Sequence, residues 1–129
     1  MIVKSALIVM IGTVGMLAAA AQADVASEIA TATDHAGFAV ASQNIGGIRM
    51  HLRHAVNCLV GPGAKDFNTS EVNPCEKLGN GAIPDTTSTT VKGKLEAAVV
   101  AAQAGIAAKD MGAAKKSASD VYAALRAIK

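Results

Sequence analysis

Aromatic side chains are scarce in this sequence: 129 residues include two phenylalanines, one tyrosine and no tryptophan. Proteins that bind single-stranded nucleic acids stack the bases on aromatic side chains, and nucleic-acid interfaces in general carry basic patches. Here 12 lysines and arginines are balanced by 10 acidic residues, and they form no basic block. We therefore expect no nucleic-acid partner, and the shortage of bulky side chains predicts a thin core.

Motifs for catalysis and for covalent haem attachment are missing as well. The two cysteines, Cys58 and Cys75, are not in a C-x-x-C arrangement, and neither G-x-S-x-G nor H-E-x-x-H occurs. There is no C-x-x-C-H, so haem c is excluded. A non-covalent haem held by histidine and Met50 or Met111 is disfavoured, because small side chains form a poor haem pocket. We expect a protein that is not an enzyme.

No apolar run reaches the roughly 20 residues that a membrane-spanning helix needs. A shorter apolar stretch, from residue 6 to about residue 17, follows Lys4 and precedes Ala21-Gln22-Ala23. A positive start, a short apolar core and an A-x-A site are typical of a secretory signal peptide. We predict a signal peptide over 1–23, cleaved between Ala23 and Asp24, with a retained N-terminal anchor as the alternative. The domain 24–129 would then lie in the periplasm with no stable membrane anchor.

Alanine, the residue with the highest helix propensity, is abundant in the remaining chain. Apolar residues recur there at spacings of three and four, which predicts amphipathic helices over about 25–43, 47–60, 89–108 and 112–128. Gly46-Gly47 and Gly112 indicate turns within two helical hairpins, although one long kinked helix is an alternative for the first pair. Residues 61–87 are rich in Gly, Pro and Asn turn signals and are expected to be irregular.

The two halves of the chain resemble each other. Residues 40–49 align with 106–115, and Cys58-Leu59 then aligns with Ala124-Leu125. The substitutions keep chemical type at nearly every position. We therefore predict an all-α fold, in which two antiparallel helical hairpins form an up-down four-helix bundle with a long loop between them.

The two cysteines bracket most of that loop. In an oxidising compartment such a pair usually forms a disulfide, which for a loop of this size stabilises the fold by roughly 3 kcal/mol in the chain-entropy model. We favour a Cys58–Cys75 disulfide that fixes the loop to the end of the second helix. The alternative is a Cys58 thiolate that serves as a metal ligand.

All three histidines, His35, His51 and His54, lie in the first predicted hairpin. At about 100° per residue, His51 and His54 share one strip of the second helix, and His35 lies level with His54 on the first. The handedness of the bundle decides whether the two strips converge, and the sequence leaves this open. Converging imidazoles would suit copper, zinc or nickel, with Glu28 or Asp34 as an added carboxylate. Diverging imidazoles would lie on a solvated face.

The stretch Ala39-Val40-Ala41, a glycine turn, and then His51-Leu52-Arg53-His54-Ala55 and Leu59 resembles the small metal-binding proteins of the bacterial periplasm. These are helical bundles that bind copper and other divalent ions through many histidines. The resemblance implies His54 most directly as a ligand, with His51 and His35 beside it. The chain departs from the family in having three histidines, none of them in its second half, and in its Cys58–Cys75 segment.

Two functions of different classes are therefore expected. The first is a periplasmic protein that buffers or delivers divalent copper or zinc through His35, His51 and His54. The second is a non-catalytic interaction or stress-related module, whose 60–87 loop recognises a protein partner with Phe67 as an apolar anchor. Histidine substitutions would impair only the first function, and loop substitutions would impair the second.

Overall fold

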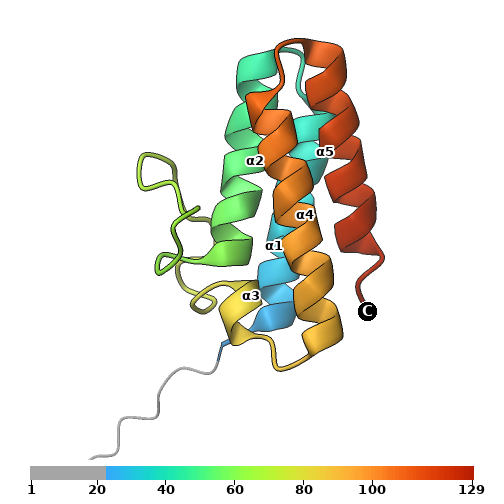
Figure 1. The fold of residues 1–129 in the computed structure, drawn as a ribbon. Helices are drawn as coiled ribbons and strands as arrows, with labels where there is room; N and C mark the ends of the chain where they lie inside the picture. Colours follow the sequence, from blue (N-terminus) through green and yellow to red (C-terminus); the bar gives the residue numbers. More distant parts are fainter. Residues whose placement is uncertain (1–22) are drawn as a thin grey trace, which may run out of the picture.

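The structure, a computed structural model, describes residues 23–129 and confirms the predicted all-α bundle. Figure 1 shows the long helices lying along one another, with a short helix near the bottom of the bundle. The helices of this part of the chain are α1 (Val25–Ala41), α2 (Ile45–Val60), α3 (Ala82–Asp85), α4 (Thr89–Ala107) and α5 (Met111–Arg126). Residues 1–22 of the predicted signal peptide lie outside the described part. No helix within 23–129 is both long and apolar enough to cross a membrane.

Each long helix begins at a polar side chain that accepts a hydrogen bond from the backbone N–H three residues further on. Such capping satisfies an amide that otherwise has no partner in the first turn. The capping residues are Asp24, Asn44, Ser88 and Asp110. They account for the two starts that differ from the expected ones, Ile45 and Met111, whereas α1, α4 and α5 end one or two residues earlier than expected. Asn44 starts α2 at Ile45, so the glycine pair that was predicted as a turn lies in the first turn of the helix.

The two hairpins repeat one packing plan, as their sequences indicate. When residue 40 is aligned with residue 106, the bounds of α2 coincide with those of α5, and the caps Asn44 and Asp110 coincide too. Buried positions also coincide between the halves. These pairs are Ala32 with Ala98, Ala36 with Ala102, Ala39 with Gly105, Ile48 with Ala114, Leu52 with Ala118, Ala55 with Val121, and Leu59 with Leu125.

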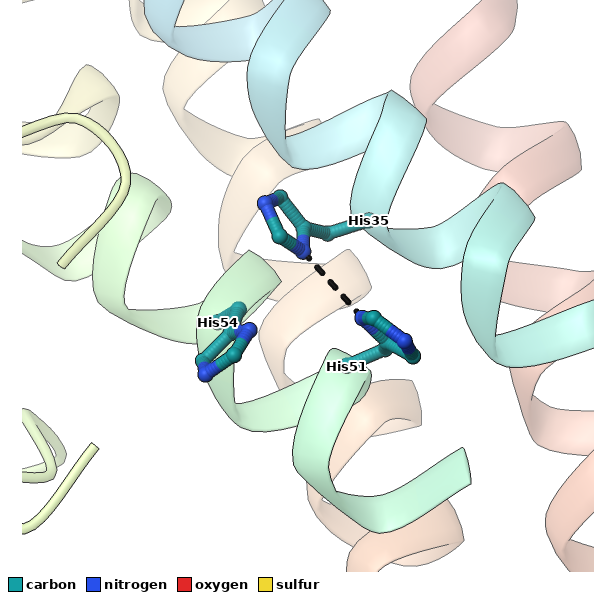
Figure 2. Close-up of side chains that lie close together, drawn as sticks. All are labelled: His35, His51 and His54. Atoms are coloured by element: carbon teal, nitrogen blue, oxygen red, sulfur yellow. Dashed lines mark hydrogen bonds between the residues drawn. The ribbon is translucent and has the colours of Figure 1, made fainter. Parts of the chain in front are cut away.

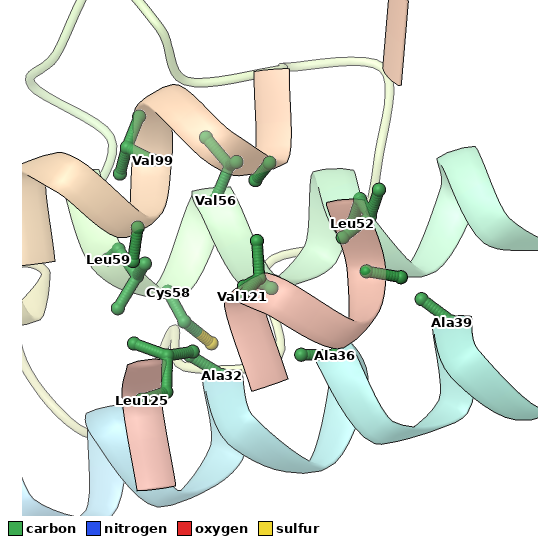
Figure 3. Close-up of a cluster of buried hydrophobic side chains, with 14 of the residues drawn as sticks. Ala32, Ala36, Ala39, Leu52, Val56, Cys58, Leu59, Val99, Val121 and Leu125 are labelled. Atoms are coloured by element: carbon green, nitrogen blue, oxygen red, sulfur yellow. The ribbon is translucent and has the colours of Figure 1, made fainter. Parts of the chain in front are cut away.

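The core lies along the axis of the bundle and combines small residues with a few branched ones (Figure 3). Alanines on α1 let the neighbouring helices approach closely, while leucines and valines from α2, α4 and α5 fill the space between them. α1 packs against α2 and α5, and α4 packs against α5 and α2. Short side chains therefore fill the thin core that the sequence predicted. The outer faces of α1 and α2 remain available for polar groups.

The first part of the segment between α2 and α4 lies outside the four long helices, beside α2 (Figure 1), and its last part, α3, packs against α1, α2 and α4. It was expected to be irregular over 61–87, but residues 82–85 form the single helical turn α3, because Asp85 and Thr86 donate backbone bonds to Gly81 and Ala82. The predicted disulfide between Cys58 and Cys75 is present, with a Cα–Cα separation of 5.1 Å. It fixes the middle of this segment to the last turns of α2.

Candidate metal centre

The three histidines lie together in the groove between the first two long helices. α1 contributes His35, and α2 contributes His51 and His54 from successive turns. One possible ligand atom from each ring lies within 4.8 Å of the other two. Figure 2 shows the three rings facing one another between α1 and α2. The two strips therefore converge, and the group could hold a metal ion.

The spacing of the nitrogens fits a small cation. His35 Nδ1 and His51 Nδ1 are 3.4 Å apart (Figure 2). Two ligands at the usual zinc–nitrogen distance of about 2.0–2.1 Å, in tetrahedral geometry, lie about 3.3–3.4 Å apart. Even the widest separation, 4.8 Å, exceeds the reach of two such bonds by less than about 1 Å. Small ring rotations are enough to bring all three nitrogens onto one ion.

His54 is the most specific part of the group, because its two ring nitrogens have different surroundings. Its Nε2 lies 3.3 Å from Oε2 of Glu71, in the loop that follows α2. Its Nδ1 is buried and has no hydrogen-bond partner. The Glu71 contact favours a proton on Nε2, which leaves an unshared electron pair on Nδ1. Histidines that ligate metals typically donate their other N–H to a carboxylate in this way.

Burial and the nearby imidazoles lower the pKa values of His35 and His51, which keeps these two rings neutral at neutral pH. The pKa of His35 is lowered to about 4, chiefly by burial and then by the nearby His54 and His51, against a smaller opposing effect of Asp34. Burial and His54 also lower the pKa of His51. A neutral ring has a lone pair to give to a metal, so these rings need not release protons at neutral pH in order to bind one.

An apolar side chain borders the group on its open side. Phe38, one turn after His35, is 52% exposed, and its ring lies edge-on to His35 with the centroids 5.5 Å apart. The centroids of Phe38 and His51 are also 5.5 Å apart. Apolar groups around a metal site limit the access of water to it. Phe38 was not among the residues predicted for the site, although its helical spacing from His35 places it on the same face.

Among the other residues singled out from the sequence, Glu28 does not join the histidines. Its carboxyl group is buried and accepts a hydrogen bond of 2.8 Å from the backbone N–H of Gly81. Burial raises its pKa, which the Gly81 bond partly offsets. Asp34 acts on His35 only through its charge. Cys58 is in the disulfide, so the alternative of a thiolate ligand is wrong.

Glu71 is the site residue that sequence reasoning missed. It lies 17 residues beyond His54 in a stretch without periodicity, and only the path of the loop brings it back to α2. The one available indication was its position between Cys58 and Cys75, because a disulfide returns that segment to the second helix.

No model of a known protein family matches the chain, and no characterised protein or solved structure matches it either. The resemblance to small metal-binding proteins of the periplasm therefore stays a prediction. The function is therefore inferred from the geometry of the histidines and from the groups that surround them.

Proposed function

We propose that this protein binds one divalent copper or zinc ion through His35, His51 and His54, and that it buffers or delivers that ion in the periplasm without turnover. One observation carries the proposal. Three imidazoles converge within 4.8 Å, and the most buried of them, His54, has a free Nδ1 opposite an Nε2 that contacts a carboxylate.

The donor set supports copper or zinc. Imidazole nitrogen suits both ions, whereas magnesium and calcium prefer oxygen. Three nitrogens leave at least one coordination position open, unlike the four protein ligands of a closed structural zinc site. An open position lets an acceptor or a small molecule enter the coordination shell, which suits buffering or delivery. The nearest carboxylate, Glu71, already contacts His54 and Arg53, so it is poorly placed to act as a free general base.

The periplasmic location is supported by two independent features. The pattern of the first 23 residues is typical of a secretory signal peptide. The Cys58–Cys75 disulfide suits an oxidising compartment. The alternative function, recognition of a partner by the 60–87 loop, is weakened because Phe67, its expected anchor, packs partly buried against the core.

Calorimetric titration of the oxidised protein with zinc(II) and copper(II) tests the proposal. We expect saturation near one ion per chain, and no such binding in the variant His35→Ala/His51→Ala/His54→Ala. A matched control is Ser117→Ala/Asp120→Ala, which alters the positions of α5 that correspond to His51 and His54 and should bind like the wild type. Equal binding by the histidine variant, or no binding tighter than millimolar by the wild type, contradicts the proposal.

A further inference from the structure

We propose that the disulfide-closed loop is the second half of the metal site: it holds Glu71 against His54, and the Cys58–Cys75 bond sets the metal affinity through that contact. This inference rests on the proposed function. Glu71 acts in it as a positioning residue, and the ion is the borderline divalent metal, zinc or copper, that the three imidazoles would bind.

The first step is the contact between Glu71 and α2. Each oxygen of the Glu71 carboxylate faces a different residue of that helix. Oε2 lies 3.3 Å from His54 Nε2, and Oε1 lies 3.4 Å from Arg53 Nη1. Arg53 keeps the carboxylate oriented while its other oxygen lies against His54 Nε2, where its negative charge favours the proton. The electron pair of His54 is thereby left on Nδ1, the nitrogen that is buried without a partner.

The second step is the way in which the backbone on both sides of Glu71 is held. Asn57, one turn beyond His54, is fully buried. Its Nδ2 donates to the carbonyls of Asn68 (3.0 Å) and Val72 (3.2 Å), and its Oδ1 accepts from the backbone N–H of Asn68 (2.8 Å). One side chain of α2 thus fixes the loop three residues before Glu71 and one residue after it.

The third step is the covalent closure. Cys58 follows Asn57 directly and is bonded to Cys75, and both residues are buried. A long segment without helix or strand loses much conformational entropy when it is held in one place. The disulfide removes most of that conformational freedom already from the unfolded chain, so that less entropy is lost when the loop is held against α2. Loss of the bond should therefore allow the loop to leave α2 and should free His54 Nε2 from Glu71.

The second hairpin shows the same framework without this loop. The position that corresponds to His54 is Asp120, which is exposed and pairs with Lys116 at 2.7 Å on the same helix. The position that corresponds to Cys58 is Ala124. The covering loop, its disulfide and the histidines therefore occur together on one hairpin, as expected if they form a single site.

A double-mutant cycle tests the inference. Zinc affinity is measured by competition with a chromophoric chelator for the wild type, Glu71→Gln, Cys58→Ser/Cys75→Ser and the combined variant. We expect Glu71→Gln and the serine variant each to weaken zinc binding by about tenfold or more, the usual effect of losing a partner of a metal-bound histidine. The combined variant should bind no more than about twofold more weakly than Glu71→Gln, because the disulfide acts through Glu71. The electron paramagnetic resonance spectrum of copper(II) bound to Glu71→Gln should still show nitrogen ligands, but with an altered hyperfine splitting.

Two further variants keep the test decisive. Asn57→Ala frees the loop while leaving the disulfide intact, and it should weaken zinc binding in the wild type but not in the Glu71→Gln background. Val121→Ala removes buried volume from the shared core and controls for a general loss of stability; it should leave zinc affinity unchanged in the folded protein. Losses that multiply in the combined variant, or wild-type affinity in Glu71→Gln, overturn this inference while leaving the histidine site intact. Absence of zinc binding by the wild type overturns the proposed function itself.

Discussion

At the scale of single residues, His35 links the proposed metal site to the stability of the protein without metal. Its pKa in the folded chain is about 4, against an ordinary value of 6.5. Between these two values the unfolded chain binds a proton at this residue and the folded chain does not. The contribution of neutral His35 to stability is therefore complete above about pH 6.5 and is lost as the pH falls toward 4.

We expect the melting temperature of the metal-free protein to fall across this pH window, and His35→Gln to make the fall less steep, because glutamine does not titrate. Thermal melts in the presence of a chelator, at half-unit steps from pH 4 to pH 8, measure both slopes. The exposed substitution Glu96→Gln on α4 serves as a control for general acid effects. A variant slope equal to that of the wild type contradicts the assignment of this acid sensitivity to His35.

At the scale of the helices, Gly105 of α4 is tightly packed against α2 of the first hairpin and α5 of its own. A Cβ added there would lie 2.6 Å from Leu52 Cδ1 and 2.8 Å from Ser117 Cβ. Gly93 is on the same helix, and a Cβ there would meet nothing within 4 Å. Alanine substitutions at these two glycines therefore distinguish two effects. The one at Gly93 reports helix propensity alone, and the one at Gly105 also reports the packing between helices.

We expect Gly93→Ala to stabilise the protein by about 0.5–1 kcal/mol, since alanine is the better helix former. Gly105→Ala should instead destabilise it by about 1–2 kcal/mol, because overpacking of about 1–3 kcal/mol outweighs the same gain in propensity. Urea denaturation of both variants gives the two free energies of unfolding. Stabilisation by Gly105→Ala would mean that Leu52 moves aside at little cost.

The elements also show what the sequence could and could not predict. The four helices, their pairing and the disulfide followed from apolar spacing, from turn residues and from the cysteines. A Gly pair usually ends a helix and therefore predicts a turn at Gly46-Gly47, whereas the Asn44 cap starts α2 before these glycines. The convergence of the histidines depends on how the helices are rotated, which spacing alone leaves undetermined. Glu71 was missed because its position depends on three bonds from Asn57 to an aperiodic loop.

At the scale of the whole molecule, the repeat gives the histidine-bearing hairpin an internal counterpart. The helix bounds and buried positions of the second hairpin follow those of the first, so residues at corresponding positions occupy corresponding faces of the bundle. The counterparts of the three histidines are Ala101, Ser117 and Asp120. The polar face between α4 and α5 thus has the framework of a site without its ligands.

We expect Ala101→His/Ser117→His/Asp120→His to create a second zinc site, raising the stoichiometry from about one to about two ions per chain in a calorimetric titration. The new site should bind at least about tenfold more weakly than the native one, because no carboxylate from a disulfide-held loop orients its histidines. A stoichiometry that stays near one would show that the hairpins differ in helix rotation despite their shared buried positions. A second site as tight as the first would show that three converging imidazoles are sufficient, and that Glu71 adds little to the affinity.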